Sequence, residues 1–179
     1  MLGMRNYGFV ILHSQHFHLY ALFCLSIPRI FLIMIKVAII GAGAAGCFCA
    51  VNLKRMMPEA DITVYESGKK PLAKVAVTGG GRCNLTNSFR LVRSIKSVYP
   101  RGEKLMKRML KAFSHEDTMS WFENEGVRLV VQEDECVFPA SQNAMEIVGT
   151  LTALMRSQGV SLRLSTRVSS IAPVEEGGY

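Results

Sequence analysis

Three glycines with the spacing Gly41-x-Gly43-x-x-Gly46 follow directly on an apolar run. Gly41 permits a tight turn, Gly43 lets a pyrophosphate approach the backbone, and Gly46 lets a helix pack closely on a strand. The N-terminus of that helix offers free N–H groups and a positive dipole end to phosphates. We therefore expect this turn to bind a dinucleotide, with contacts that include the intervening Ala42, Ala44 and Ala45.

An acidic residue, Glu66, stands at the end of the next apolar segment, twenty residues past Gly46. Its carboxylate is placed to accept hydrogen bonds from an adenosine ribose. It would also repel a 2′-phosphate. The pattern therefore predicts FAD or NAD(H), and not NADP(H), at this site.

A second glycine-rich stretch, TGGGRCNLTN, covers residues 78–87. Its three consecutive glycines allow the backbone to fold against a flat or anionic ligand. Its other candidate ligand-binding residues are Arg82, Cys83, Asn84, Thr86 and Asn87, which follow Gly79, Gly80 and Gly81. An ordinary connecting loop is the alternative, because Asn and Gly are also turn formers. Cys83 beside a cation could be a thiol of lowered pKa, although a packed side chain is favoured.

The elements that must position the first site follow from the hydrophobic pattern. Ile35–Ile40 is predicted as a buried parallel strand, and a helix follows it until Pro58. Asp61–Glu66 is predicted as a second strand. Strand, glycine turn, helix and strand make a right-handed βαβ unit. The fold class expected is therefore α/β, a Rossmann-like FAD-binding domain with a parallel sheet flanked by helices.

Beyond the second glycine stretch the pattern predicts helices and strands in alternation. Ser114, with Asp117 as its reciprocal partner, is expected to cap a helix that ends at Gly126, and Ser141 to cap another. The helix that begins after Ser141 is expected to close near Gly159. The remaining predicted elements are a helix over 102–113, a strand over 127–132 and a strand over 160–171.

The formal net charge of +7 comes from one segment. Between Arg90 and Lys111 there are eight basic residues and one acid, Glu103. Such a segment could hold nucleic acid, but the apolar residues of the predicted helix form a stripe, with lysines and arginine opposite. A solvated helix face is therefore favoured, and no nucleic-acid partner is expected.

The first 33 residues are expected to be an extension outside the fold, which leaves residues 34–179 as the N-terminal part of an FAD/NAD(P)-binding domain. The apolar run within the first 33 residues contains Pro28 and Arg29, so we expect no membrane partner. The five cysteines include no C-x-x-C pair, which favours reduced thiols and a cytoplasmic location. No metal-ligand spacing appears, and no residue is assigned a catalytic role.

The segments GAGAAG, VYES, KVAVTGGGRCNLTN and VFPAS together resemble the BaiN and aminoacetone-oxidase-like flavoproteins, NAD(P)/FAD-dependent oxidoreductases. The resemblance runs from Lys36 to the end of the chain. It implies that the first glycine turn and Glu66 hold the ADP half of FAD. It further implies that Lys74 and residues 79–87 lie toward the pyrophosphate and isoalloxazine, and that Val168 contacts adenine through its backbone. Members of that family usually carry Arg where this chain has Cys136, and they are about twice as long.

The function expected is the FAD-binding portion of an oxidoreductase that acts on a small-molecule substrate, with NAD(P)H as a possible reductant. Three alternatives stay open at this point. The chain could be an NAD-binding dehydrogenase module, an inactive truncated fragment or, against the preference for a solvated helix face, a nucleic-acid-binding domain. The sequence does not predict the oligomeric state.

Overall fold

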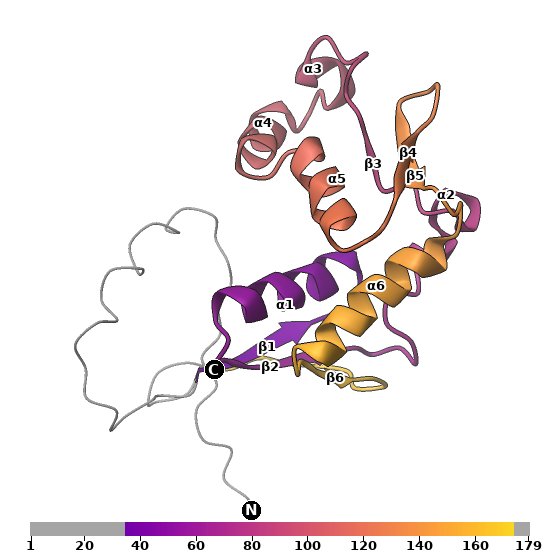
Figure 1. Cartoon of the computed structure of the whole chain (residues 1–179). Coiled ribbons are helices and arrows are strands. Elements are labelled where there is room, and N and C mark those ends of the chain that lie inside the picture. Colours follow the sequence, from indigo (N-terminus) through magenta and orange to yellow (C-terminus); the bar gives the residue numbers. More distant parts are fainter. Residues whose placement is uncertain (1–34, 174–179) are drawn as a thin grey trace, which may run out of the picture. The chain divides into compact units, whose positions relative to one another are not determined.

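The computed structural model describes residues 35–173 of the 179-residue chain. These residues form two compact units (Figure 1). The first contains the residues up to Pro71 together with those from Met155 onward, and the second contains Leu72–Leu154. The predicted extension, residues 1–33, lies outside the described part of the chain. Within residues 35–173, no helix has both the length and the hydrophobicity of a membrane span.

The first unit contains a parallel sheet with the strand order β1-β2-β6. Its strands and helix are β1 (Lys36–Ile40), α1 (Ala44–Met56), β2 (Asp61–Tyr65) and β6 (Ser161–Arg163). Val37 pairs with Ile62, both buried, and the buried Val64 pairs with the half-buried Leu162, so that these apolar side chains of neighbouring strands share one register. The predicted βαβ unit and its parallel sheet are confirmed.

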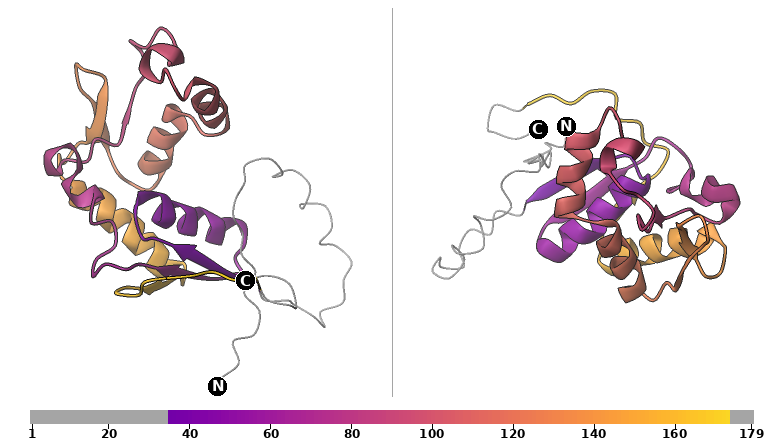
Figure 2. Two further views of the ribbon diagram at one scale, coloured as in Figure 1. Left: turned by 180° about the vertical axis from the view of Figure 1, so that it is seen from behind. Right: turned by 90° about the horizontal axis from the view of Figure 1, so that it is seen from above.

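Helix α1 packs along β1 and β2 in the first unit (Figures 1 and 2). Its buried residues are Cys47, Ala50, Val51 and Leu53. These side chains meet the apolar residues of the strands, among them Ile62 and Val64. The helix ends at Met56, two residues before Pro58, because proline cannot continue it. The sheet and α1 together hold the glycine turn in place.

The second unit contains a small antiparallel sheet, of order β3-β5-β4, that the sequence did not predict. Its strands are β3 (Thr86–Asn87), β4 (Leu129–Val131) and β5 (Cys136–Pro139), and β4 and β5 form the hairpin seen in orange in Figure 2. Strands of two to four residues are too short to show a period of two. The other elements are η1 (Val75–Val77), α2 (Thr78–Gly81), α3 (Ile95–Val98), α4 (Glu103–Ala112), α5 (His115–Asn124) and α6 (Ala144–Ser157), which continues into the first unit.

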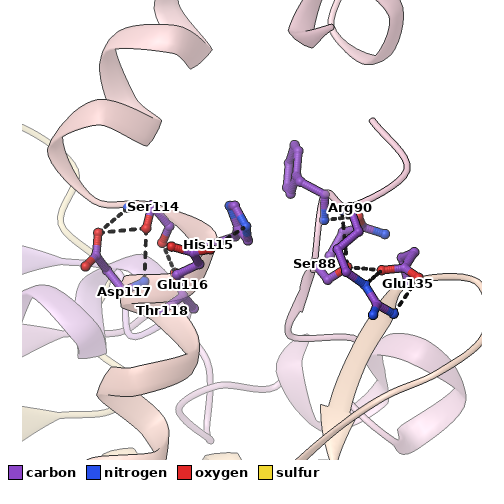
Figure 3. A network of polar contacts seen from close by, with 10 residues as sticks. Ser88, Arg90, Ser114, His115, Glu116, Asp117, Thr118 and Glu135 are labelled. Carbon is purple, nitrogen blue, oxygen red and sulfur yellow. Dashed lines mark hydrogen bonds and ion pairs between the residues drawn. The ribbon is translucent and has the colours of Figure 1, made fainter. Parts of the chain in front are cut away.

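The predicted cap of α5 is confirmed, whereas that of α6 is wrong. Ser114 accepts a hydrogen bond from the Asp117 N–H through its side chain, and the Asp117 carboxylate accepts one from the Ser114 N–H (Figure 3). At α6 the helix begins after Asn143, whose Oδ1 accepts from the Met145 N–H at 2.9 Å. Ser141 instead donates to the Glu146 side chain. Both residues are good capping types, so the sequence could not choose between them.

The predicted strand over 160–171 is much shorter in the structure. Only Ser161–Arg163 pairs with β2, and the chain then turns at Ser165, whose φ is +51°. Residues after the turn run back along the end of β2, where Ser165 and Thr166 donate to the carbonyls of Gly68 and Glu66 at 2.9 and 2.8 Å. These local hydrogen bonds replace the longer ladder that the pattern predicted.

One buried acid connects the β4–β5 hairpin to the segment that follows β3 (Figure 3). Glu135, 7 % exposed, accepts two hydrogen bonds from Arg90 at 2.8 Å each and a third from the Ser88 hydroxyl. The Arg90 guanidinium and then the Ser88 hydroxyl hold the pKa of the Glu135 carboxyl below its usual value. The pair joins two segments that are far apart in the sequence.

We expect Glu135→Gln to lower the thermal midpoint of unfolding by several degrees at neutral pH, because Arg90 loses its charged partner. Since the folded-state pKa of Glu135 is depressed, its contribution is present above the unfolded-state pKa of about 4.3 and is lost as the pH falls through the folded-state value. Denaturant unfolding of both proteins from neutral to acidic pH tests this. A difference between them that stayed constant down to strongly acidic pH would contradict it.

Candidate functional site

The first glycine turn has two glycines that the protein itself requires and one that it does not. Gly41 has a φ of +99° and donates to the Tyr65 carbonyl at 2.7 Å, which ties the turn to the end of β2. A Cβ on Gly46 would lie 1.9 Å from the Gly41 carbonyl oxygen. A Cβ on Gly43 would meet no atom within 4 Å. Gly43 therefore leaves open space at the start of α1, as close approach of a ligand would need.

The N-terminus of α1 is exposed and carries no side-chain cap among the described residues. Gly43, Ala44 and Ala45 are exposed, whereas Ala42 is buried. The first N–H groups of a helix have no partner within the helix, and the dipole makes that end positive. This end of α1 can therefore accept an anionic group such as a pyrophosphate.

Glu66 stands directly beside the turn, as the sequence predicted. Its Oε2 accepts from the Ala42 N–H at 2.9 Å, and its Oε1 accepts from the Gly68 N–H at 2.7 Å. The Gly68 N–H and then the Ala42 N–H hold the pKa of the Glu66 carboxyl below its usual value. The group is therefore ionised at neutral pH, so that both of its oxygens can accept hydrogen bonds from ribose hydroxyls.

Val168, the predicted adenine contact, lies in the segment after the turn at Ser165 and is not in a strand. It is half-buried. The hydrogen bonds of Ser165 and Thr166 to the Glu66–Gly68 backbone hold the start of this segment next to the Glu66 carboxylate. The first unit thus brings the glycine turn, Glu66 and the segment leading to Val168 together.

In the second unit, the second glycine-rich stretch, residues 78–87, forms a tight left-handed turn at its glycines. We call these ten residues the signature stretch. The φ angles of Gly79, Gly80 and Gly81 are +55°, +67° and +82°. A Cβ on Gly79 would lie 2.6 Å from the Asn84 nitrogen and 3.0 Å from the Phe138 ring. Any side chain here would therefore strain the turn.

The signature cation, Arg82, folds back over its own unit. Its guanidinium lies 4.4 Å from the centre of the Phe138 ring, and it donates to the Gly79 carbonyl at 3.2 Å and to the Gln142 side chain at 3.3 Å. These contacts orient Arg82 while it stays exposed. The sequence analysis did not identify Phe138 and Gln142 as its partners. Lys74 is exposed, and no described residue accepts from its side chain.

A cavity of about 460 Å³ adjoins the second half of the signature stretch, all within the second unit. Its polar wall contains Asn84, Thr86 and Asn87, and its apolar wall includes Phe89 and Tyr99. Asn87 uses Oδ1 to accept from the Phe89 N–H at 2.8 Å, which leaves its amide group as a donor. The signature asparagines therefore line a space that a planar polar ring can enter.

The favoured interpretation of Cys83 as a packed side chain is confirmed, and the alternative of a thiol with a lowered pKa is wrong. Its side chain is buried, 4 % exposed, at a φ of +62°, and burial raises the pKa of the thiol. Cys47 in α1 is similar, because burial and then the nearby Glu66 charge raise its pKa to about 11.

We expect Cys47 and Cys83 to react more slowly than Cys49 and Cys136 with an alkylating reagent at neutral pH. The thiolate is the reactive form, and the raised pKa of Cys47 and of Cys83 makes it scarce. Each is buried, so access adds to the effect. Alkylation followed by peptide mass spectrometry checks this, with a denatured sample as the control. Fast labelling of either residue in the folded protein would contradict the structure.

Most predicted site residues fall into two groups, one in each unit. The first consists of the glycine turn, Glu66 and Val168, and the second of Lys74 and residues 79–87. Among residues 35–173, no group of three or more His, Cys, Asp or Glu side chains could hold a metal ion.

The chain is similar in sequence to several known proteins. The chain is 26 % identical to the 3-dehydro-bile acid delta(4,6)-reductase of Clostridium scindens over 138 residues, 77 % of this chain and 33 % of that protein. It is 31 % identical to the ribosomal RNA dihydrouridine synthase of Haemophilus influenzae over 137 residues, which are 76 % of this chain and 33 % of that protein. It is also 31 % identical to the Escherichia coli protein of that name over 139 residues, which are 78 % of this chain and 33 % of that protein.

The chain therefore spans about a third of the length of these curated relatives. Among solved structures, it is similar to THI4 of Thermovibrio ammonificans, with a TM-score of 0.46 and 11 % identity over 72 % of this chain and 38 % of that chain. Residues 35–179 match the family described as the HI0933-like protein Rossmann domain. These residues include the parallel βαβ unit and its glycine turn, and the chain therefore belongs to the HI0933-like Rossmann-domain proteins.

Proposed function

We propose that this chain is the FAD-binding portion of a flavin-dependent oxidoreductase. The observation that carries the proposal is the glycine turn, where open space at Gly43 meets an uncapped helix N-terminus beside the ionised Glu66. The backbone of residues 42–46 would hold the pyrophosphate, and Glu66 would accept from the ribose hydroxyls. A bound FAD supplies hydride and electron transfer through its isoalloxazine ring.

The second unit supports FAD over a nicotinamide dinucleotide alone. Its signature stretch combines a left-handed glycine turn, an oriented Arg82 and a cavity lined by Asn84 and Asn87. These are groups that suit a planar or anionic ligand. Arg82 and Lys74 would offer positive charge, and the asparagine amides would offer hydrogen bonds to ring carbonyls and nitrogens.

The relatives suggest the reaction class. The names of two relatives, a 3-dehydro-bile acid delta(4,6)-reductase and a ribosomal RNA dihydrouridine synthase, both indicate reduction of a carbon–carbon double bond. We propose the same class for the full-length protein, with a double bond next to a carbonyl in a small molecule as the target. A base in RNA is a second candidate substrate, which the exposed basic residues of α4 favour.

The experiment uses full-length protein whose flavin has been reduced with dithionite under anaerobic conditions. Addition of cyclohexenone should restore the oxidised flavin spectrum much faster than addition of cyclohexanone, which lacks the double bond. NADH and NADPH are then compared as reductants in place of dithionite. A protein without flavin, or one whose flavin responds equally to both ketones, would contradict the proposal.

A further inference from the structure

Helix α4 of the second unit is amphipathic but leaves none of its residues buried. Leu105 and Met109, on the apolar side, are 55 % and 54 % exposed. The apolar side was expected to face the protein, which would leave the basic side as an ordinary solvated surface. The structure removes that reason for dismissing the basic side, because no apolar residue of α4 is buried and only Met106 and Leu110 of its apolar side are half-buried.

The cations of α4 form one exposed stripe. Lys104, Lys107, Arg108 and Lys111 lie three or four residues apart, which places them on the same side of the helix over about 10 Å. Arg101 precedes the helix by two residues, and all five side chains are exposed. We call these five residues the basic face.

The basic face keeps most of its positive charge. Lys107 pairs with Glu103 at 2.7 Å, while Arg101, Lys104, Arg108 and Lys111 form no ion pair with any residue from 35 to 173. The acids at the start of α5 do not neutralise them either. Asp117 is engaged with Ser114 in the capping box, and Glu116 lies 4.0 Å from His115 (Figure 3).

We infer that the basic face binds the phosphate backbone of RNA. A row of uncompensated cations is the feature that phosphates recognise, since each contact releases counterions from the nucleic acid. The half-exposed Leu105 and Met109 beside the row add apolar contacts for riboses or unstacked bases. The inference deepens the second candidate substrate of the proposed function and identifies where on this chain such a substrate would be held.

The test compares three forms of the full-length protein. In the first variant, Lys104→Glu, Arg108→Glu and Lys111→Glu reverse three charges of the basic face. The matched control reverses three exposed cations elsewhere, with Lys70→Glu, Arg128→Glu and Arg156→Glu. The probe is a fluorescent single-stranded RNA of mixed sequence with a hairpin, and binding is followed by anisotropy over a range of salt concentrations.

We expect the basic-face variant to bind the RNA at least tenfold more weakly than the wild type near physiological salt. The slope of log affinity against log salt should fall by about 2, because three single-strand phosphate contacts are lost at about 0.7 each. The control should change both quantities much less, although its net charge is the same. Circular dichroism shows whether both variants keep their folded helix content.

RNA binding that is absent, insensitive to salt, or equal in the two variants would overturn the inference. Polyglutamate serves as a probe for an acidic protein partner. A protein that binds polyglutamate but does not bind RNA would overturn the inference as well. Flavin content is measured on the same samples. A colourless protein that binds RNA through the basic face would contradict the proposed oxidoreductase alone, while a yellow protein that ignores RNA would contradict this inference alone.

Discussion

Gly46→Ala is expected to destabilise the folded protein by roughly 3–5 kcal/mol, near the upper end of single substitutions. The added Cβ would lie 1.9 Å from the Gly41 carbonyl oxygen and 3.1 Å from its carbon. Both are backbone atoms, and Gly41 is itself fixed by its hydrogen bond to the Tyr65 carbonyl. Since no flexible side chain can move aside, the helix or the turn must shift away from the sheet.

The matched control is Gly149→Ala in α6, another helical glycine, whose Cβ would meet no atom within 4 Å. We expect it to stabilise the protein by about 0.5–1 kcal/mol, because alanine has the higher helix propensity. Urea unfolding of both variants measures the two effects. Equal, small changes for Gly46 and Gly149 would show that α1 does not pack on β1 as closely as the structure has it.

Gly43→Ala is expected to leave the fold intact and to weaken FAD binding by about tenfold to a hundredfold, or about 1.4–2.8 kcal/mol. The Cβ would enter the open space at the start of α1, where no protein atom lies within 4 Å. Its φ of −81° is ordinary for any residue. No residue that the structure describes is left to clash with the new methyl, so a loss of affinity in this variant would come from the ligand and not from misfolding.

Isothermal titration of FAD into apo full-length protein measures this effect, and the thermal midpoint of the apo form serves as the folding control. Gly149→Ala is again the matched variant, since it lies on α6 and away from the turn. An unchanged FAD affinity in Gly43→Ala would mean that the pyrophosphate does not approach this backbone. A loss of folding would mean that the space beside Gly43 is filled by protein.

The sequence predicted best where local patterns and the fold agree. The apolar run of β1, the glycine spacing and the acid after β2 all depend on short-range rules, and each is found in place. The capping box at Ser114 is another example, because its two hydrogen bonds involve residues three apart. Such features need no knowledge of distant contacts.

Apart from the cap of α6, the failures occurred where distant segments decide the outcome. The β3-β5-β4 sheet joins Thr86–Asn87 to Cys136–Pro139 across about fifty residues, and its short strands carry no period of their own. The strand predicted over 160–171 stops at Arg163 because the chain turns back to bond with Glu66 and Gly68. The orientation of Arg82 likewise depends on Phe138 and Gln142, which no local rule connects to it.

For Cys83, in the candidate site, the sequence left two interpretations open and favoured the correct one. The side chain is packed, as expected, and burial raises the pKa of its thiol. The adjacent Arg82 had left a lowered pKa as the alternative, because the effect of one neighbouring cation can be predicted from the sequence more easily than the degree of burial.

The central claim is that the turn at residues 41–46 and Glu66 hold the ADP half of FAD. The most direct measurement is the cofactor released by heat from purified full-length protein, identified by chromatography and compared with the protein concentration. The account predicts FAD, at one molecule per chain in the wild type and far less in Gly43→Ala prepared in the same way. A colourless wild-type protein that takes up no FAD when it is supplied would contradict it.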